Sequence, residues 1–351
     1  MSTFAEDAPR KLFVVGVGRS GTSLLQSMLG SHTGIAFLPE TGFVRRHLLG
    51  EAARAAPASG SPTAFLDALG PEDRSSRWPI EPDRLRELAE VGRAEAEARG
   101  WTPARCVYEA VSRACAAGAR FAGDKDPRNV EHLEGLAALW PDCRVVHVVR
   151  DPRDVLLSRK KAAWSRDHGL FRQLAACAVQ FRLGARAAPR LGDERLRALH
   201  YERLLADPAG ELDGLCRWLG LEFEPAMLEF APTASALVAP DELAWKSTTL
   251  GPLLAGNTRK WVAGLTPFEI GATEGACAEA MAHGGYPRAD ASMLRAATPE
   301  GRSASPGGVG PALLAGRACG RLVRALARLY TLRRRAPGVP PAASEPGPVA
   351  R

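Results

Sequence analysis

Short runs of β-branched residues that lead into helical patterns recur along this chain. Residues 12–17 form one such run, which ends at a glycine turn, and residues 20–29 then repeat apolar positions at helical spacing. Residues 144–149 form a second run, RVVHVV, followed by Asp151 and Pro152, which are typical of an N-cap and a first helical position. Each run therefore predicts a buried strand that passes directly into a helix.

The spacing of these units predicts the class of the fold. Weaker strands are expected at residues 120–123 and 196–201. Residues 50–118 are rich in alanine and arginine and predict helices, with a Pro/Ser/Gly loop at residues 56–62 that indicates a variable insertion. Strands that alternate with helices predict an α/β fold, in which a P-loop-like parallel sheet is covered by helices on both faces. We assign residues 1–296 to this domain.

The composition changes after this domain. Residues 297–311 are rich in Gly, Ser and Pro and predict a linker, whereas residues 336–351 predict a disordered end. Residues 312–335 predict a basic amphipathic helix, because leucines and arginines each recur at helical spacing: Leu322, Leu326, Leu329 and Leu332, and Arg317, Arg321, Arg324 and Arg328. Such a helix would either rest on the anionic inner face of a membrane or pack against the domain, and the sequence leaves both open.

The charge of the chain is concentrated in this tail. The 351 residues carry a net charge of +7, and 24% charged with 46% hydrophobic residues is typical of a globular protein. Residues 301–351 contain nine arginines and one acidic residue, Glu345, so the first 300 residues sum to −1. No nucleic-acid partner is therefore predicted, and an anion-binding site in the domain has to come from local motifs.

The N-terminal residues and the cysteines predict a cytoplasmic protein. The first residues include Glu6 and Asp7, where a secretory signal would have basic residues and then an apolar run. No later segment approaches the roughly 18 uninterrupted apolar residues of a membrane span. The seven cysteines are widely spaced and never form C-x-x-C, which predicts reduced, mostly buried thiols and no metal site.

A glycine-rich segment after the first predicted strand has the pattern of a phosphate-binding loop. In G-V-G-R-S-G-T-S, residues 16–23, backbone N–H groups and the start of the next helix would surround an anion. A nucleotide triphosphatase would have a lysine after Gly21, but Thr22 follows it directly and the cation is Arg19. No acidic strand end is predicted to bind magnesium. The alternative is that these glycines only pack a helix on a strand.

Further motifs accompany this loop at characteristic spacings. Arg150 follows a predicted core strand, where ligands bind in open α/β sheets, and Ser158 comes two helical turns later on the same face. An arginine fork and a hydroxyl suit a phosphate monoester, whereas the alternative for Arg150 is an ion pair with a neighbouring aspartate. The other motifs are L-P-E-T with Glu40, D-K-D-P with Lys125, H-Y-E-R-L with Tyr201, K-S-T with Ser247 and N-T-R-K-W with Lys260.

Together these motifs resemble the sulfotransferase family that uses 3′-phosphoadenosine 5′-phosphosulfate (PAPS), and in particular its tyrosylprotein-sulfotransferase-like branch. The resemblance spans residues 11–265 in separated blocks. It implies the sulfotransferase fold and in-line transfer of a sulfuryl group from PAPS to an acceptor hydroxyl, with no metal. The residues similar to the family's 5′-phosphosulfate loop are Gly18, Arg19, Ser20, Gly21, Thr22 and Ser23.

The resemblance also implies roles for the other motif residues. Arg150 and Ser158 would hold the 3′-phosphate, and Tyr201 and Lys260 would add nucleotide contacts. Lys125 would stabilise charge in the transition state, Glu40 would be the catalytic base, 21 residues after Arg19, and Ser247 would donate a hydrogen bond. The alternatives are an ion pair of Lys125 with a neighbouring aspartate, a loop carboxylate for Glu40, and core packing for Tyr201.

Three departures from the branch leave the acceptor open. Ala162 stands where a second arginine near the 3′-phosphate is expected, and Gly42 replaces an arginine that reads acidic residues beside the target tyrosine. The spacing from Ser247 to Lys260 is about two residues short. The acceptor is therefore a hydroxyl on a peptide tyrosine, a sugar, a lipid or a small molecule.

Competing hypotheses remain for the base and for the function. His32 and His47 lie in the same part of the chain as Glu40, but neither has the family spacing. A P-loop kinase or nucleotide triphosphatase is the alternative enzyme, and magnesium dependence would distinguish it. The non-enzymatic alternative is a nucleotide-binding protein that keeps the fold without turnover.

Overall fold

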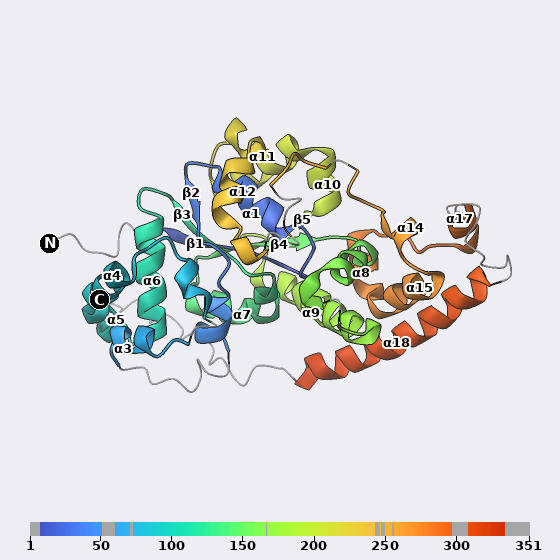
Figure 1. Cartoon of the computed structure of the whole chain (residues 1–351), viewed down its shortest axis with the longest axis horizontal. Helices are drawn as coiled ribbons and strands as arrows, with labels where there is room; N and C mark the ends of the chain where they lie inside the picture. The colour runs from blue at the N-terminus through green and yellow to red at the C-terminus, as the bar shows by residue number, and fades with distance from the viewer. Residues whose placement is uncertain are drawn as a thin grey trace, which may run out of the picture.

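A sheet of five parallel strands forms the centre of the molecule (Figure 1). The computed structural model describes residues 8–50, 60–70, 73–165, 167–242, 246, 250–254, 256–296 and 308–333. In the order β2-β3-β1-β4-β5, the strands are β1 (Arg10–Gly16), β2 (Ile35–Phe37), β3 (Phe121–Lys125), β4 (Arg144–Val149) and β5 (Leu196–His200). The predicted α/β fold with a parallel sheet is confirmed.

Helices cover both faces of this sheet. Above it in Figure 1 lie α1 (Thr22–Gly30), α10 (Tyr201–Ala206), α11 (Pro208–Leu219) and α12 (Ala231–Leu237). Below it lie α6 (Pro103–Cys115), α7 (Leu133–Leu139) and α9 (Leu170–Leu191), and farther out α3 (Pro62–Asp67), α4 (Pro82–Val91) and α5 (Arg93–Ala98). The remaining helices are α8 (Pro152–Lys161), α14 (Trp261–Gly264), α15 (Pro267–Ala276), α16 (Ala278–Gly284), α17 (Ala291–Ala296) and α18 (Val309–Arg333). Shorter helical turns are Val44–Leu48, Arg74–Arg77, Pro127–His132, Ala163–Ser165, Pro225–Leu228 and Pro240–Glu242.

The central strand β1 shows why this sequence forms a two-sided core. Phe13 and Val15 face one hydrophobic core, while Leu12 and Val14 face another on the opposite side of the sheet. Side chains alternate between the faces of a strand, so a strand covered on both sides has to be apolar throughout. All four side chains are fully buried.

The predicted strand–helix junctions agree with the structure to within a few residues. Asp151 is the N-cap of α8, where its carboxylate accepts a hydrogen bond from the backbone N–H of Arg153, and Pro152 is the first helical residue. β3 ends at Lys125, two residues beyond the predicted strand. Tyr201, which was predicted to end the fourth strand, is instead the first residue of α10. β2 was not predicted.

The C-terminal helix α18 packs directly against the domain. A Cβ atom on Gly316 would lie 2.1 Å from the carbonyl oxygen of Phe268, and one on Gly320 would lie 2.2 Å from that of Ala272, so these glycines allow the backbones of α18 and α15 to touch. Residues 309–311, assigned to a linker by composition, form the first turn of this helix, and Val309 is buried. Residues 297–307 of the predicted linker and the predicted disordered end lie outside the described residues.

Two further findings concern the cysteines and the length of the apolar helices. All seven cysteines are unpaired thiols, and five of them are buried. Within the described residues, no helix is both long and apolar enough to span a bilayer.

Candidate active site

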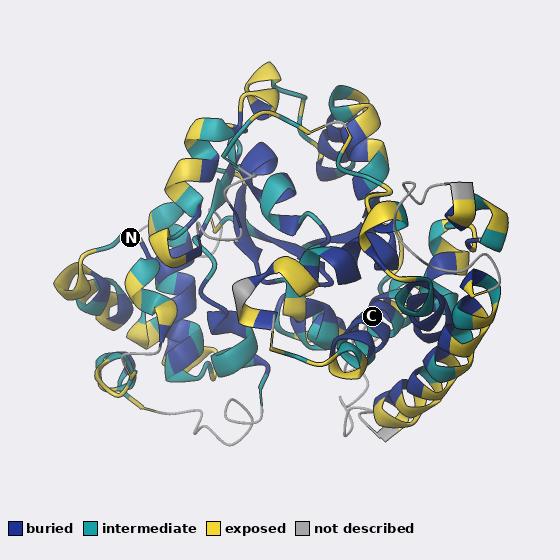
Figure 2. Cartoon of the chain, turned by 45° about the vertical axis from the view of Figure 1, so that its right-hand side comes forward, coloured by how far each residue is buried: buried dark blue, intermediate teal, exposed yellow. Residues whose placement is uncertain are grey.

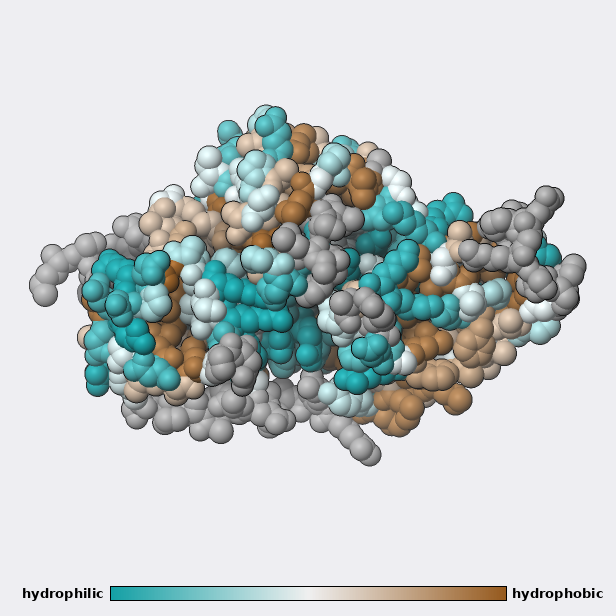
Figure 3. Space-filling model, viewed as in Figure 1, coloured by the Kyte–Doolittle hydropathy of each residue, from teal (hydrophilic) through white to brown (hydrophobic). Residues whose placement is uncertain are grey.

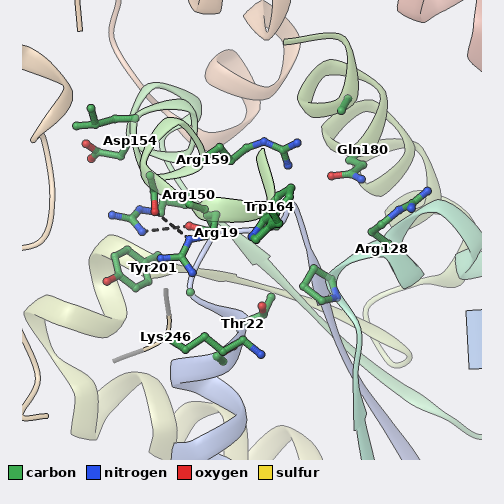
Figure 4. Close-up of a pocket in the computed structure, with 18 of the residues that line it drawn as sticks. Arg19, Thr22, Arg128, Arg150, Asp154, Arg159, Trp164, Gln180, Tyr201 and Lys246 are labelled. Atoms are coloured by element: carbon green, nitrogen blue, oxygen red, sulfur yellow. Dashed lines mark hydrogen bonds between the residues drawn. The ribbon is translucent and has the colours of Figure 1, made fainter. Parts of the chain in front are cut away.

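The carboxyl ends of the five strands meet at one edge of the sheet, and residues of the predicted site lie at every one of them. β1 leads into the glycine loop, β2 into Glu40, β4 into Arg150 and β5 into Tyr201, while Lys125 ends β3. A cavity of about 1110 Å³ lies at this edge (Figure 4). The predicted residues that line it are Gly18, Arg19, Gly21, Thr22, Ser23, Glu40, Arg150, Ser158, Tyr201 and Lys260.

Two predicted residues that the structure describes do not line the cavity. Ser20 is fully buried inside the loop, and its Oγ atom has no hydrogen-bond partner among the described residues. Lys125 is also buried, with its ammonium group against the carboxylate of Glu40. Ser247 lies outside the described residues, so its role stays a prediction.

The glycine loop presents the start of helix α1 to the cavity. Gly21, the residue before the helix, has a φ of +103°, and a Cβ atom there would lie 2.3 Å from the ring of Tyr201. Only glycine fits both constraints. No side chain caps this helix and its first turn contains no acidic residue, so its N–H groups are available to an anion.

Two arginines converge beside this loop. The guanidinium of Arg150 donates to the backbone oxygens of Arg19 and Asn257, at 3.2 and 2.9 Å, and lies 4.1 Å from the centre of the Tyr201 ring. The Nε of Arg19 donates to Ser158 Oγ at 3.0 Å. Burial, together with the charge of Arg150, lowers the pKa of Arg19. Figure 4 shows Arg19, Arg150 and Tyr201 together on one side of the cavity.

Neither of these arginines has a carboxylate partner in the described part of the chain. The predicted alternative paired Arg150 with Asp151 or Asp154, but Asp151 forms its ion pair with Arg153. Asp154 instead accepts hydrogen bonds from the backbone N–H groups at positions 259 and 261, at 2.7 and 3.0 Å. The guanidinium of Arg150 is buried and that of Arg19 is partly buried, and neither forms an ion pair within the described residues, so together they suit an anion.

Glu40 lies between two lysines. Its Oε2 atom contacts the ammonium groups of Lys125 and Lys246, the latter at 2.7 Å, and Lys246 also donates to Glu242 at 2.7 Å. Burial alone would raise the pKa of Glu40, but the charges of the two lysines outweigh it and hold the pKa well below its usual range. Burial lowers the pKa of Lys125 to about 8, against the opposing charge of Glu40. Glu40 is therefore ionised, and its basicity depends on where the lysines are.

Comparison with known proteins shows which family the chain belongs to. Residues 9–225, more than half of the chain, match the profile of the sulfotransferase family. The chain belongs to the sulfotransferase family.

Individual relatives of this chain are distant. Protein-tyrosine sulfotransferase 2 of Gallus gallus is 23% identical over 224 residues, which cover 62% of this chain and 53% of that protein. An uncharacterised protein of Aquifex aeolicus is 24% identical over 232 residues, covering 64% of this chain and 27% of that protein. The chain thus spans about half or less of the length of these relatives. The sulfotransferase domain of the Synechococcus PCC 7002 olefin synthase shares the fold, with a TM-score of 0.52, 21% identity, and coverage of 73% of this chain and 89% of that domain.

The sulfotransferase site contains residues that the sequence did not single out. Lys246, the second partner of Glu40, precedes the predicted Ser247. Arg77 comes from the segment interpreted as a variable insertion, yet it donates to the backbone oxygen of Glu40 at 2.8 Å and lies 3.5 Å from Glu242. The insertion therefore helps to hold Glu40. Arg159 was also not singled out, and the basic run R-K-K directly after Ser158 is the one sequence feature that could have indicated it. The Nε atom of Arg159 is buried and has no hydrogen-bond partner in the described part of the molecule.

Cationic side chains lie near two of the positions, 162 and 42, at which this chain departs from the tyrosylprotein branch. Ala162 is buried, but Arg159 of the same helix lines the cavity, 3.6 Å from the position that a Cβ atom would take on Gly18. Gly42 has a φ of +71°, and Arg45 lies 3.0 Å from its Cβ position. Arg45 is paired with Asp126 at 2.8 Å.

The two histidines considered as alternative bases do not line the cavity. The imidazole of His32 lies 2.8 Å from the backbone oxygen of Glu222, and that of His47 lies 2.8 Å from Asp73. Trp261, part of the predicted N-T-R-K-W contact, is buried beneath the guanidinium of Arg153, at 3.8 Å, and belongs to the core. Tyr201 both packs in the core and lines the cavity.

Proposed function

We propose that this sulfotransferase uses PAPS as its donor and transfers the sulfuryl group to an acceptor hydroxyl by in-line displacement, with Glu40 as general base. The observation that carries the proposal is the arrangement of cations and N–H donors in the cavity. The uncapped start of α1 with Arg19, and Arg150 with Ser158, offer places for two anionic groups on one ligand. A phosphosulfate at one end of an adenosine and a phosphate at the other match this arrangement.

The chain's own residues fit the two ends of this donor. The loop at residues 18–23 would hold the 5′-phosphosulfate, and Arg150 and Ser158 would hold the 3′-phosphate, with Arg159 as a further cation. The Nε atoms of Arg150 and Arg159 and the Oγ of Ser20 are buried and have no partner within the described residues. Buried polar atoms without partners are costly, and the oxygens of the donor would satisfy the two arginine Nε atoms, which belong to residues that line the cavity.

The Glu40–Lys125 ion pair couples donor binding to the base. When the ammonium group of Lys125 turns to the oxygen that bridges sulfur and the 5′-phosphate, Glu40 loses the largest charge that lowers its pKa. Glu40 then becomes a better acceptor for the proton of the acceptor hydroxyl. The acceptor oxygen forms the new bond to sulfur, the bond from sulfur to the bridging oxygen breaks, and its electron pair stays on the departing 5′-phosphate, next to Lys125.

Membership of the sulfotransferase family argues against the kinase and nucleotide triphosphatase alternatives. For the acceptor, the similarity to a protein-tyrosine sulfotransferase supports a tyrosine hydroxyl as one candidate. We place the reaction in the cytoplasm, since seven widely spaced thiols suit a reducing compartment.

Calorimetry with nucleotide products tests the donor. Because Arg150 is assigned to the 3′-phosphate, Arg150→Ala should weaken binding of 3′-phosphoadenosine 5′-phosphate (PAP) by about 2 to 5 kcal/mol, as for truncating one partner of a buried charge pair. It should leave the much weaker binding of adenosine 5′-phosphate unchanged. Arg144→Ala, at the other end of the same strand, is the matched control. Equal affinity of the wild-type protein for the two nucleotides would refute the assignment.

A further inference from the structure

Large apolar side chains are exposed along one face of α18. Of the eleven large hydrophobic residues exposed in the described part of the chain, six belong to this helix: Leu314, Leu322, Leu326, Leu329, Tyr330 and Leu332. Leu322 and Leu326 are 69% and 67% exposed. Figure 2 shows exposed residues along the outer side of α18, and Figure 3 shows that hydrophobic residues gather there. An apolar patch of this kind indicates a binding surface.

The two predicted alternatives for this helix are both compatible with its packing. α18 contacts the domain through a different face, made of Leu313, Gly316, Gly320, Val323 and Ala327. Arg317 fixes this face further, because it pairs with the buried carboxylate of Glu274 at 2.7 Å. The exposed leucines are therefore held outward on a helix that is itself anchored to the domain.

The charge of α18 indicates which kind of partner would bind the exposed leucines. α18 contains no acidic residue, and Arg321, which is exposed next to Leu322, has no ion-pair partner in the described part of the chain. In the sequence, arginines also occupy positions 333–335. An anionic lipid surface complements both the apolar and the basic residues. A second copy packed face to face would instead bring arginines against arginines.

The exposed face also borders the cavity that contains the site. Leu326, Ala327 and Tyr330 line it, together with Ala175 and Val179 of α9. We propose that α18 docks the enzyme on an anionic membrane surface, so that this apolar end of the cavity opens toward the bilayer. Given the proposed function, the acceptor that suits this position is a hydroxyl carried by a lipid.

Co-sedimentation with lipid vesicles tests the docking, and it requires no catalytic activity. The full chain should pellet with vesicles of equal parts phosphatidylglycerol and phosphatidylcholine, and not with phosphatidylcholine alone. Leu322→Gln/Leu329→Gln should weaken the partition at least about tenfold, and Arg321→Gln about fivefold. Val91→Gln, a 67% exposed valine on α4, is the matched control and should bind as the wild type does.

The outcomes separate docking from catalysis. PAP binding by each variant shows that the fold and the donor site are intact, and its absence in the wild-type protein would refute the proposed function but not the docking. Docking is refuted if the wild-type chain stays in the supernatant with anionic vesicles, or if the leucine variant pellets as fully as the control. A dimer that the leucine variant dissociates, without any vesicle binding, would show that the face joins two copies instead.

Discussion

At the scale of single residues, the position of Lys125 decides the chemistry of the site. Its ammonium group is buried against Glu40, and Lys246 occupies the other side of the same carboxylate oxygen. A carboxylate held by two lysines is a weak base, whereas the same carboxylate beside one lysine is a stronger one. We therefore expect proton abstraction to become efficient only after the donor has drawn Lys125 away.

Replacing the base tests this assignment. Glu40→Gln keeps the shape of the side chain but cannot accept a proton, so turnover should fall about 10²- to 10⁴-fold while donor affinity changes little. The loss should shrink for an acidic acceptor such as a nitrophenol. Glu242→Gln, which removes the other carboxylate partner of Lys246, is the control and should keep most of the activity. Wild-type turnover by Glu40→Gln on an alcohol or tyrosine acceptor would rule out this base.

The pH dependence of donor binding tests the role of Lys125. Since the pKa of Lys125 is lowered to about 8, its side chain is charged below that pH and becomes neutral above it. The affinity for PAP, measured by calorimetry, should accordingly fall as the pH rises past about 8, whereas Glu40, whose pKa is lowered, adds no loss near neutral pH. Lys125→Arg should move the decline to higher pH. An affinity that stays constant through this range would show that Lys125 does not contact the donor.

At the scale of elements, the sequence predicted those whose signals are local. The strand at residues 144–149 and its Asp151–Pro152 helix start agree with the structure because a β-branched run, an N-cap and a proline all act within a few residues. β2 was missed because it has only three residues, too few for a periodic pattern, and because the pairing with β3 that stabilises it comes from a distant part of the chain. Arg77 and Lys246 were missed for the same reason, because they are 37 and 206 residues away from Glu40 in the sequence and contact it only in the folded chain.

The contact between α18 and α15 predicts that a Gly→Ala substitution in α18 lowers the stability of the protein instead of raising it. Gly→Ala in a helix normally stabilises by up to about 1 kcal/mol. Gly320→Ala should instead destabilise the protein, because its Cβ atom would lie 2.2 Å from the backbone oxygen of Ala272. Gly310→Ala in the same helix has no atom within 4 Å and is the matched control. Thermal unfolding measures both, and equal effects would contradict the close packing.

At the scale of the whole molecule, the parallel sheet brings together site residues that come from separate motifs. The glycine loop, Glu40, Lys125, Arg150 and Tyr201 lie at the carboxyl ends of its five strands, along one edge. The glycine loop and Arg150 were predicted from local strand and turn patterns, whereas Glu40, Lys125 and Tyr201 were expected from the resemblance to the family's motifs. The sequence did not predict that Lys125 lies behind Glu40, nor that the cavity continues to α18, since both depend on how distant segments pack.

The distribution of charge is the second property of the whole molecule. The first 300 residues are almost neutral, and the excess of arginine is confined to the last 51. If the proposed anion site and the proposed membrane surface are both correct, substitutions in the cavity and in the tail should change anion binding and membrane docking separately.

The most direct test of the central claim is mass spectrometry of the products formed from PAPS and a panel of acceptors. The panel should contain a tyrosine peptide, a sugar, a lipid alcohol and a simple phenol, each incubated with the wild-type chain, with Glu40→Gln and without enzyme. We expect a sulfated acceptor and one PAP for each sulfate transferred, in the presence of a metal chelator, and a much slower reaction with Glu40→Gln. Transfer of phosphate from a nucleotide triphosphate with magnesium, or PAP binding with no sulfated product from any acceptor, would contradict it.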